Sequence, residues 1–151
     1  IILGDGRWKN ELKKLIKNAG LTDDFQLLNR VPIENIGSYF KEVDALYLSL
    51  KKNETFNKTI PGKLQTYMNS SKPIIASISG ETNRIINESK CGFVSEAEDY
   101  LTLRDNILKF YNLNTHEKKK LGYNGKNYSD INFNKMNILS NLEQEIESIL
   151  K

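Results

Sequence analysis

Short apolar runs alternate with segments of helical spacing over the first two thirds of the chain. Such runs stand at residues 1–3, 25–28, 45–50, 73–76 and 92–94, and each has the length of a buried strand. Between them, apolar residues recur every three or four positions, as on a helix packed by one face. Buried strands that alternate with helices are typical of a parallel sheet covered on both faces. The pattern therefore predicts an α/β fold, a doubly wound Rossmann-like sheet of about five or six parallel strands.

From residue 99 to the end, the pattern is helical only. The first predicted helix has five apolar or aromatic residues on one face: Tyr100, Leu103, Ile107, Phe110 and Tyr111. A second is predicted at 115–126. The last has apolar residues at near-heptad spacing: Met136, Leu139, Leu142, Ile146 and Ile149. We expect this stripe to pack on the domain, with a coiled-coil partner as the alternative. Residues 99–151 are thus the all-helical part of one domain, residues 1–151.

The chain begins inside an apolar run, because Ile1, Ile2 and Leu3 precede the first polar residue and no methionine stands in front of them. Natural chains rarely begin in a core strand. We therefore expect this chain to be the C-terminal piece of a longer protein, whose N-terminal domain comes before it.

Composition favours a soluble globular domain and excludes several kinds of site. Hydrophobic residues make up 38% of the 151 residues and charged residues 27%, which is typical of a folded domain. The single cysteine, Cys91, excludes an intramolecular disulfide and fits the reducing cytoplasm; we expect it to be buried. One cysteine and one histidine, His116, do not suffice for an ordinary transition-metal site, so we expect no metal cofactor. His116 lies in a lysine-rich helix start and is given no catalytic role.

The charge is mildly basic, with a formal net charge of +3 at pH 7. This value suits both an anionic small ligand and peripheral association with the inner face of the cell membrane, and it does not distinguish them. No stripe of interleaved basic and aromatic residues is present, so a nucleic-acid partner is not predicted. No apolar stretch approaches the roughly 20 residues that span a bilayer.

Ligands of open parallel sheets bind beyond the carboxyl ends of the strands, which directs attention to the loops after the predicted strands. The first such loop, residues 4–7, contains Gly6 and Arg7. It resembles part of a dinucleotide fingerprint but lacks the third glycine, so NAD binding is not predicted. A tight turn that requires glycine accounts for the glycines, and Arg7 then provides a cation beside the crevice.

The most specific signal is the helix start at Pro61, Gly62 and Lys63. A glycine there lets a phosphate approach unpaired backbone N–H groups, and the positive end of the helix dipole adds attraction. Lys63 adds a mobile positive charge. These features predict a phosphate site. The alternative is an ordinary Pro-Gly helix start with an exposed lysine.

A second helix start follows the fourth predicted strand, at Gly80 and Glu81. Its free amides suit hydroxyl or carboxyl groups, and Glu81 suits the hydroxyls of a sugar. An ordinary helix start with an acidic first turn is the alternative interpretation.

Six segments in chain order resemble the C-terminal domain of the group 1 glycosyltransferases of the GT-B fold, especially the bacterial surface-polysaccharide branch. They are residues 4–7, 29–32, 45–49, 60–68 with 72–76, 80–81 and 91–94. Together they cover nearly the whole chain. In that branch, a Pro-Ser-Lys-Leu segment stands where this chain has residues 61–64.

The resemblance implies a donor site for a nucleoside-diphosphate sugar. It places Arg30 and Val31 against the base, mainly through backbone groups, the helix start at 62–63 at the diphosphate, and Gly80 with Glu81 near the donor sugar. Members usually need no metal, because basic residues and a helix N-terminus neutralise the leaving diphosphate.

Two departures from the family pattern concern this donor site. Lys58 and Thr66 stand where many members have paired glutamates that contact the donor sugar and ribose, and Gly62 replaces the serine. Thr66 therefore lies at a donor-binding position without the carboxylate.

The resulting functional hypothesis is the donor-binding half of a glycosyltransferase that builds capsule, O-antigen or a related surface polysaccharide on a glycan or lipid-linked acceptor. The acceptor site and the catalytic groups would belong to the missing N-terminal domain, so no catalytic residue is assigned and the fragment alone should be inactive. The alternatives are half of a GT-B nucleotide-sugar 2-epimerase and a non-catalytic nucleotide-binding domain. A receiver domain is disfavoured, since Ser49 to Lys51 stand where its phosphoacceptor aspartate would be.

Overall fold

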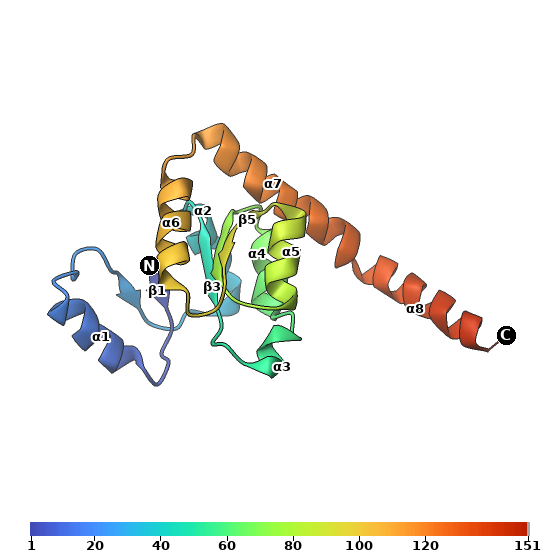
Figure 1. Cartoon of the computed structure of the whole chain (residues 1–151), viewed down its shortest axis with the longest axis horizontal. Coiled ribbons are helices and arrows are strands. Elements are labelled where there is room, and N and C mark those ends of the chain that lie inside the picture. Colours follow the sequence, from blue (N-terminus) through green and yellow to red (C-terminus); the bar gives the residue numbers. More distant parts are fainter. Residues whose placement is uncertain (151) are drawn as a thin grey trace. The chain divides into compact units, whose positions relative to one another are not determined.

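The computed structural model describes residues 1–150. Its chain forms two compact units, Ile1–Lys41 and a second that begins at Glu42 (Figure 1). The α/β class predicted from the sequence is confirmed, and every strand pair is parallel. The strands form two sheets, of two and three strands, where the sequence predicted about five or six in one sheet.

The first unit contains the smaller sheet. Strand β1 (Ile2–Leu3) pairs with β2 (Leu27–Leu28), and helix α1 (Lys9–Asn18) connects them. A short 3-10 helix η1 (Ile33–Asn35) and helix α2 (Ile36–Lys41) follow Pro32, whose missing N–H costs nothing at a helix start. Both strands have only two residues, because the chain leaves the ladder at Gly4, which has φ +142°, and Phe25 remains outside the ladder.

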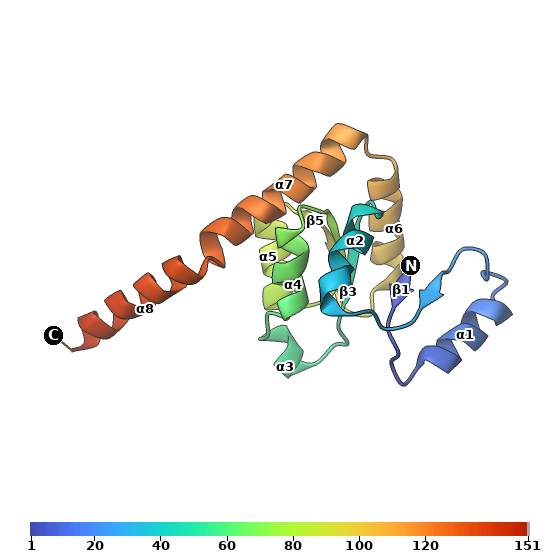
Figure 2. The ribbon, with the colours of Figure 1, turned by 180° about the vertical axis from the view of Figure 1, so that it is seen from behind.

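The second unit is built on the three-stranded sheet, in the order β3-β4-β5. Its strands are β3 (Leu46–Ser49), β4 (Ile74–Ser77) and β5 (Gly92–Ser95). All four residues of the central strand β4 are buried, because helices cover both faces of the sheet. The covering helices are α4 (Gly62–Asn69), α5 (Glu81–Ser89) and α6 (Tyr100–Tyr111). Helix α6 lies on one side of the sheet and α4 and α5 on the other (Figures 1 and 2).

The core of the second unit lies between the sheet and helices α4 and α5. It consists of nine buried residues: Leu48, Leu64, Met68, Ile74, Ala76, Ile78, Ile85, Ile86 and Cys91. The buried position predicted for Cys91 is confirmed, and burial raises the pKa of its thiol. This close-packed core gives a rigid support to the start of α4 and to the Gly80 turn after β4.

Helix α7 (Thr115–Asn132) is six residues longer than the predicted 115–126. It packs along α4 through small residues, since its buried positions are Gly122, Gly125 and Ser129. A Cβ added at Gly122 would lie 2.0 Å from the carbonyl oxygen of Ser71, so only glycine permits this approach. The apolar pattern underestimated α7 because its contact face is small and not hydrophobic.

Two further features of the helical part differ from the prediction. On α6 the buried residues are Asn106 and Phe110, whereas Tyr100, Ile107 and Tyr111 are exposed. The segment 51–59, where the sequence shows no apolar run, contains helix α3 (Glu54–Asn57). That helix is short and polar, so it has no apolar periodicity to reveal it.

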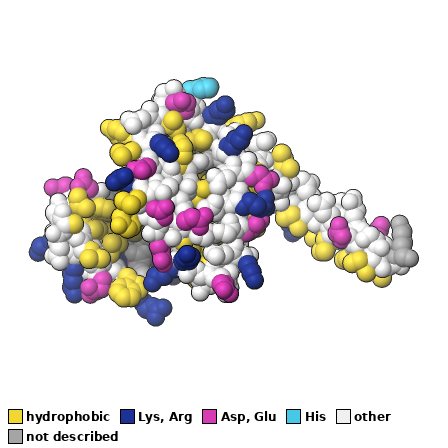
Figure 3. Space-filling model, viewed as in Figure 1, with side chains coloured by type: hydrophobic (Ala, Val, Ile, Leu, Met, Phe, Trp, Pro, Cys, Tyr) yellow, Lys and Arg dark blue, Asp and Glu magenta, His cyan; other side chains and the backbone are white. Residues whose placement is uncertain are grey.

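The last helix, α8 (Lys135–Ile149), forms as predicted but does not pack on the domain. None of its residues is buried, and its apolar stripe lies along one exposed edge (Figure 3). The helix begins at the Asn134 cap and runs away from the sheet, so it contacts little besides α7. Within residues 1–150 no helix combines the length and the apolar character that crossing a membrane requires.

Candidate functional site

In the first unit, Asp5 and Lys9 join the two loops at the carboxyl ends of β1 and β2. The Lys9 ammonium donates to Asp5 Oδ1 at 2.6 Å and to Asn29 Oδ1 at 2.7 Å. The backbone N–H of Arg30 donates to Asp5 Oδ2 at 2.9 Å. The hydrogen bond from Lys9, followed by that from Arg30, holds the pKa of Asp5 below its usual value.

This clamp places the four residues predicted in the first unit on neighbouring loops. Gly6 and Arg7 follow Asp5, and Arg30 and Val31 lie in the loop that Asp5 binds. The N–H of Arg30 donates to the Asp5 carboxylate, whereas the side chains of Arg7 and Arg30 are exposed and form no hydrogen bond or ion pair with any described residue. One backbone N–H that was expected to be free for a base at this loop is therefore already occupied.

A pocket of about 450 Å³ lies beside Gly6 and Arg7, between β1 and α1. Most of its lining is apolar, including Leu3, Leu12 and Trp8, and Trp8 is 75% exposed. Its composition suits a flat or aliphatic group better than a phosphate. Arg30 and Val31 do not line this pocket.

In the second unit, the predicted phosphate site lies at the open start of α4. Pro61 precedes the helix in an extended conformation and offers no side-chain cap. Among residues 1–150, the backbone N–H groups of Gly62 and Lys63 have no hydrogen-bond acceptor. The Lys63 side chain is exposed and has no ion pair with any described residue. The hydroxyl of Thr66 donates to the Gly62 carbonyl at 3.1 Å, on the same helix.

The start of α5 is held against the segment that leads into α4. The hydroxyl of Thr82, wholly buried, donates to the Thr59 carbonyl oxygen at 3.0 Å. Gly80 has φ +76°, and a Cβ added there would lie 2.1 Å from the carbonyl oxygen of Asn57. Only glycine fits this turn. The two predicted helix starts are therefore brought to the same edge of the sheet, beyond the end of β4.

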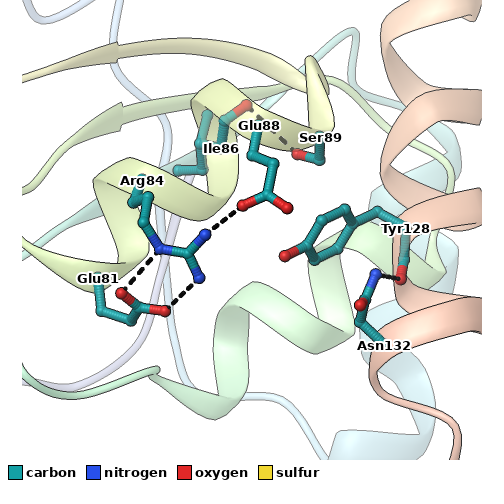
Figure 4. Close-up of polar contacts among 7 residues, drawn as sticks. All are labelled: Glu81, Arg84, Ile86, Glu88, Ser89, Tyr128 and Asn132. Carbon is teal, nitrogen blue, oxygen red and sulfur yellow. Dashed lines mark hydrogen bonds and ion pairs between the residues drawn. The ribbon is translucent and has the colours of Figure 1, made fainter.

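The carboxylate of Glu81 is engaged by an arginine of its own helix (Figure 4). Arg84 donates to both oxygens of Glu81, with Nη2 to Oε1 at 2.6 Å and Nε to Oε2 at 3.0 Å. Arg84 also pairs with Glu88, and the Tyr128 hydroxyl from α7 points toward this group. The hydrogen bonds from Arg84 lower the pKa of Glu81. A sugar hydroxyl at Glu81 would meet a carboxylate already charged and oriented.

A further polar network lies between the loops after β4 and β5. Ser79 Oγ donates to Glu96 Oε2 at 2.5 Å and accepts from the Ala97 N–H at 3.0 Å. The Asn83 amide donates to Glu96 Oε1 at 3.2 Å and to the Ile78 carbonyl at 3.0 Å. Ser79 itself is 7% exposed. Glu96 therefore bridges the β5–α6 loop to both sides of the Gly80 turn.

The model of the family described as Glycosyl transferases group 1 matches residues 1–128. This chain belongs to the group 1 glycosyl transferases. The family resemblance drawn from the six segments is confirmed, while the bacterial surface-polysaccharide branch stays a prediction.

One relative of this group 1 chain is the uncharacterized glycosyltransferase MJ1178 of Methanocaldococcus jannaschii, which is 25% identical over 128 residues. The matched region is 85% of this chain and 34% of the relative. The chain therefore spans about a third of the length of the curated relative it matches.

Within the group 1 chain, the structure brings the predicted residues together unit by unit. Gly62, Lys63, Gly80 and Glu81 lie on the two neighbouring helix starts of the second unit, whereas the hydroxyl of Thr66 is bonded within α4. The donor-site roles of all these residues stay predictions.

Sequence reasoning missed the residues that hold these loops. Asp5 and Lys9 have the i, i+4 spacing of a helical ion pair, which would have suggested their contact. Glu96 had no comparable signal, since its partners come from another loop and helix. In the described chain, residues 1–150, no group of three or more His, Cys, Asp or Glu side chains is placed to hold a metal ion.

Proposed function

We propose that this chain is the donor-binding half of a glycosyltransferase that uses a nucleoside-diphosphate sugar. Membership of group 1 supports this reaction class. The observation that carries the proposal is the open start of α4, where two backbone N–H groups and the Lys63 ammonium are without partners among residues 1–150. Unpaired amides at a positive helix end, with a lysine beside them, suit the oxygens of a diphosphate.

The proposed chemistry uses this helix start for the leaving group. An acceptor hydroxyl forms a bond to the anomeric carbon of the sugar while the bond to the diphosphate oxygen breaks. Negative charge then grows on the diphosphate, where the amides of Gly62 and Lys63 and the Lys63 ammonium stabilise it. The hydroxyl proton passes to a base outside this chain.

The acceptor site and that base are proposed to lie in the remainder of the protein. The chain spans only 34% of the length of the relative it matches, which leaves room for a second domain. On this account the chain alone binds donor weakly and does not turn over. We also propose that the full protein works in the cytoplasm, at the inner face of the membrane, in capsule or O-antigen synthesis, as its likeness to the surface-polysaccharide branch suggests.

The first test is nucleotide binding by the full-length protein. Calorimetric titrations with UDP and with GDP identify which base is bound. We expect Lys63→Ala to weaken binding of that nucleotide at least tenfold, because a hydrogen-bonded charge pair with phosphate contributes more than the roughly 1.4 kcal/mol that corresponds to tenfold. Lys119→Ala is the matched control, since Lys119 is an exposed lysine on α7. Normal binding by the Lys63 variant would refute the diphosphate site.

Product analysis separates the transferase from the alternative epimerase. A transferase releases free nucleoside diphosphate and a glycosylated acceptor. An epimerase returns the sugar nucleotide with inverted configuration at C2 and consumes no acceptor. Incubation of the full-length protein with UDP-glucose and with GDP-mannose, each with and without a glycan or lipid-linked acceptor, followed by chromatography, distinguishes these outcomes.

A further inference from the structure

The turn at Gly80 is held in one conformation by the residues around it, although glycine itself is flexible. Glycine visits positive φ values freely, so nothing in Gly80 itself selects φ +76°. On one side the turn lies against the Asn57 backbone, and the adjacent Thr82 is bonded to Thr59. On the other side the restraint comes from the β5–α6 loop.

That second restraint passes through the Glu96 carboxylate, beside the Ala97 N–H that donates to Ser79 Oγ. Glu96 accepts the hydroxyl of Ser79, the residue before Gly80, through one oxygen. Through the other oxygen it accepts the amide of Asn83, in the first turn of α5. The two contacts therefore span the turn from both ends, and each uses a different carboxylate oxygen.

The partners of Glu96 have few alternatives to this arrangement. Ser79 has one hydroxyl proton, which is directed at Glu96, and its oxygen already accepts the Ala97 N–H. Asn83 uses its amide on Glu96 and on the Ile78 carbonyl, and its own oxygen accepts from Asn87 at 2.8 Å. A network in which each member is satisfied has one preferred geometry. Loss of the carboxylate would leave the nearly buried Ser79 hydroxyl without its acceptor.

We propose that Glu96 is a positioning residue for the sugar of the donor: by holding Ser79 and Asn83 it fixes the Gly80 turn, and with it the backbone amides at the start of α5. This inference rests on the proposed function, which places the donor sugar at this turn. Glu96 itself touches neither the sugar nor the diphosphate. It acts on the geometry of the turn, where displacements of about 1 Å are enough to lower a rate by about a hundredfold.

The experiment compares sugar nucleotide with nucleoside diphosphate in the full-length protein. If UDP is the nucleotide bound, the probes are UDP and UDP-glucose; if GDP, they are GDP and GDP-mannose. We expect Glu96→Ala to lower kcat/KM for the sugar nucleotide about 10- to 100-fold, while the Kd for the nucleoside diphosphate stays within about twofold. Glu96→Gln retains one acceptor oxygen and should recover part of the loss. Glu143→Ala, an exposed glutamate on α8, should leave both values unchanged.

A second variant tests whether the effect passes through the network. Ser79→Ala should reproduce part of the loss in kcat/KM for the sugar nucleotide. The double variant with Glu96→Ala should lose no more than the worse single variant, since both substitutions disrupt the same hydrogen-bond network. Additive losses in kcat/KM would overturn the inference. So would a Glu96→Ala protein in which the affinity for UDP or GDP falls as much as kcat/KM for the sugar nucleotide, or in which neither value changes. Wild-type protein that binds neither nucleotide would instead refute the proposed function.

Discussion

Two helix starts in the second unit are built in opposite ways. Helix α7 begins with a complete capping box: the Asn114 side chain accepts the Glu117 N–H at 3.0 Å, and the Glu117 carboxylate accepts the Asn114 N–H at 2.8 Å. Helix α4 begins after Pro61 with no side-chain cap at all. Capping normally stabilises a helix by about 1 kcal/mol, so α4 lacks a common source of stability.

The comparison extends to the other helices of this unit. Side chains of Asn53, Asp99 and Asn134 cap α3, α6 and α8. Among the described residues of this unit, the two helices without a side-chain cap follow Pro61 and Gly80, and these are the two segments of this unit that the sequence predicted for the donor. In this unit, the helices whose first N–H groups lack a side-chain cap are therefore the ones at which we propose that a ligand accepts those N–H groups.

The largest expected effect comes from reversing the charge at the open start. Lys63→Glu places a carboxylate where the phosphate oxygens are proposed to bind, although an acid in the first turn of a helix is favourable for the helix itself. We expect binding of UDP or GDP to weaken about a hundredfold and the Tm to stay equal or rise. Calorimetry and thermal unfolding of the same preparation measure both. Weakened binding together with a lower Tm would indicate damage to the fold, and the comparison would fail.

A smaller effect is expected at the capped start. Asn114→Ala removes half of the capping box and should lower the free energy of unfolding by about 1 kcal/mol. For a chain of this size that corresponds to a Tm lower by about 2–4 °C. Because this cap is far along the chain from the donor loops, the Kd for UDP or GDP should not change. A nucleotide affinity that falls with Asn114→Ala would show that the two kinds of helix start are not functionally separate.

The sequence predicted most elements because their buried faces give a periodic pattern of apolar residues. It identified all five strands and the start of α4, where a Pro-Gly pair leaves little choice. It failed where packing uses other chemistry: α7 packs through Gly122 and Gly125, and α3 is a short polar turn with an Asn53 cap. The α8 stripe predicted a helix correctly, but periodicity does not reveal what covers an apolar face.

The sequence predicted those parts of the candidate site that lie within one segment, but not the contacts between segments. Gly62, Lys63 and Gly80 each follow a strand and begin a helix, so local signals suffice to find them. The pairing of Glu81 with Arg84 was readable at i, i+3 spacing but was not recognised. The Glu96 bridge depends on a contact across 17 positions, which only the folded sheet creates.

The most direct test of the central claim is to give α4 the cap that it lacks. Pro61 already has an extended conformation suited to a capping residue, so Pro61→Asp should let a carboxylate accept the N–H groups proposed to bind phosphate. We predict that calorimetry on full-length Pro61→Asp protein gives a Kd for UDP or GDP weakened about tenfold, with a Tm equal to or above that of wild type. Wild-type affinity in a Pro61→Asp protein whose Tm is above that of wild type would mean that the cap forms without competing with the nucleotide, and the diphosphate would not bind at the start of α4.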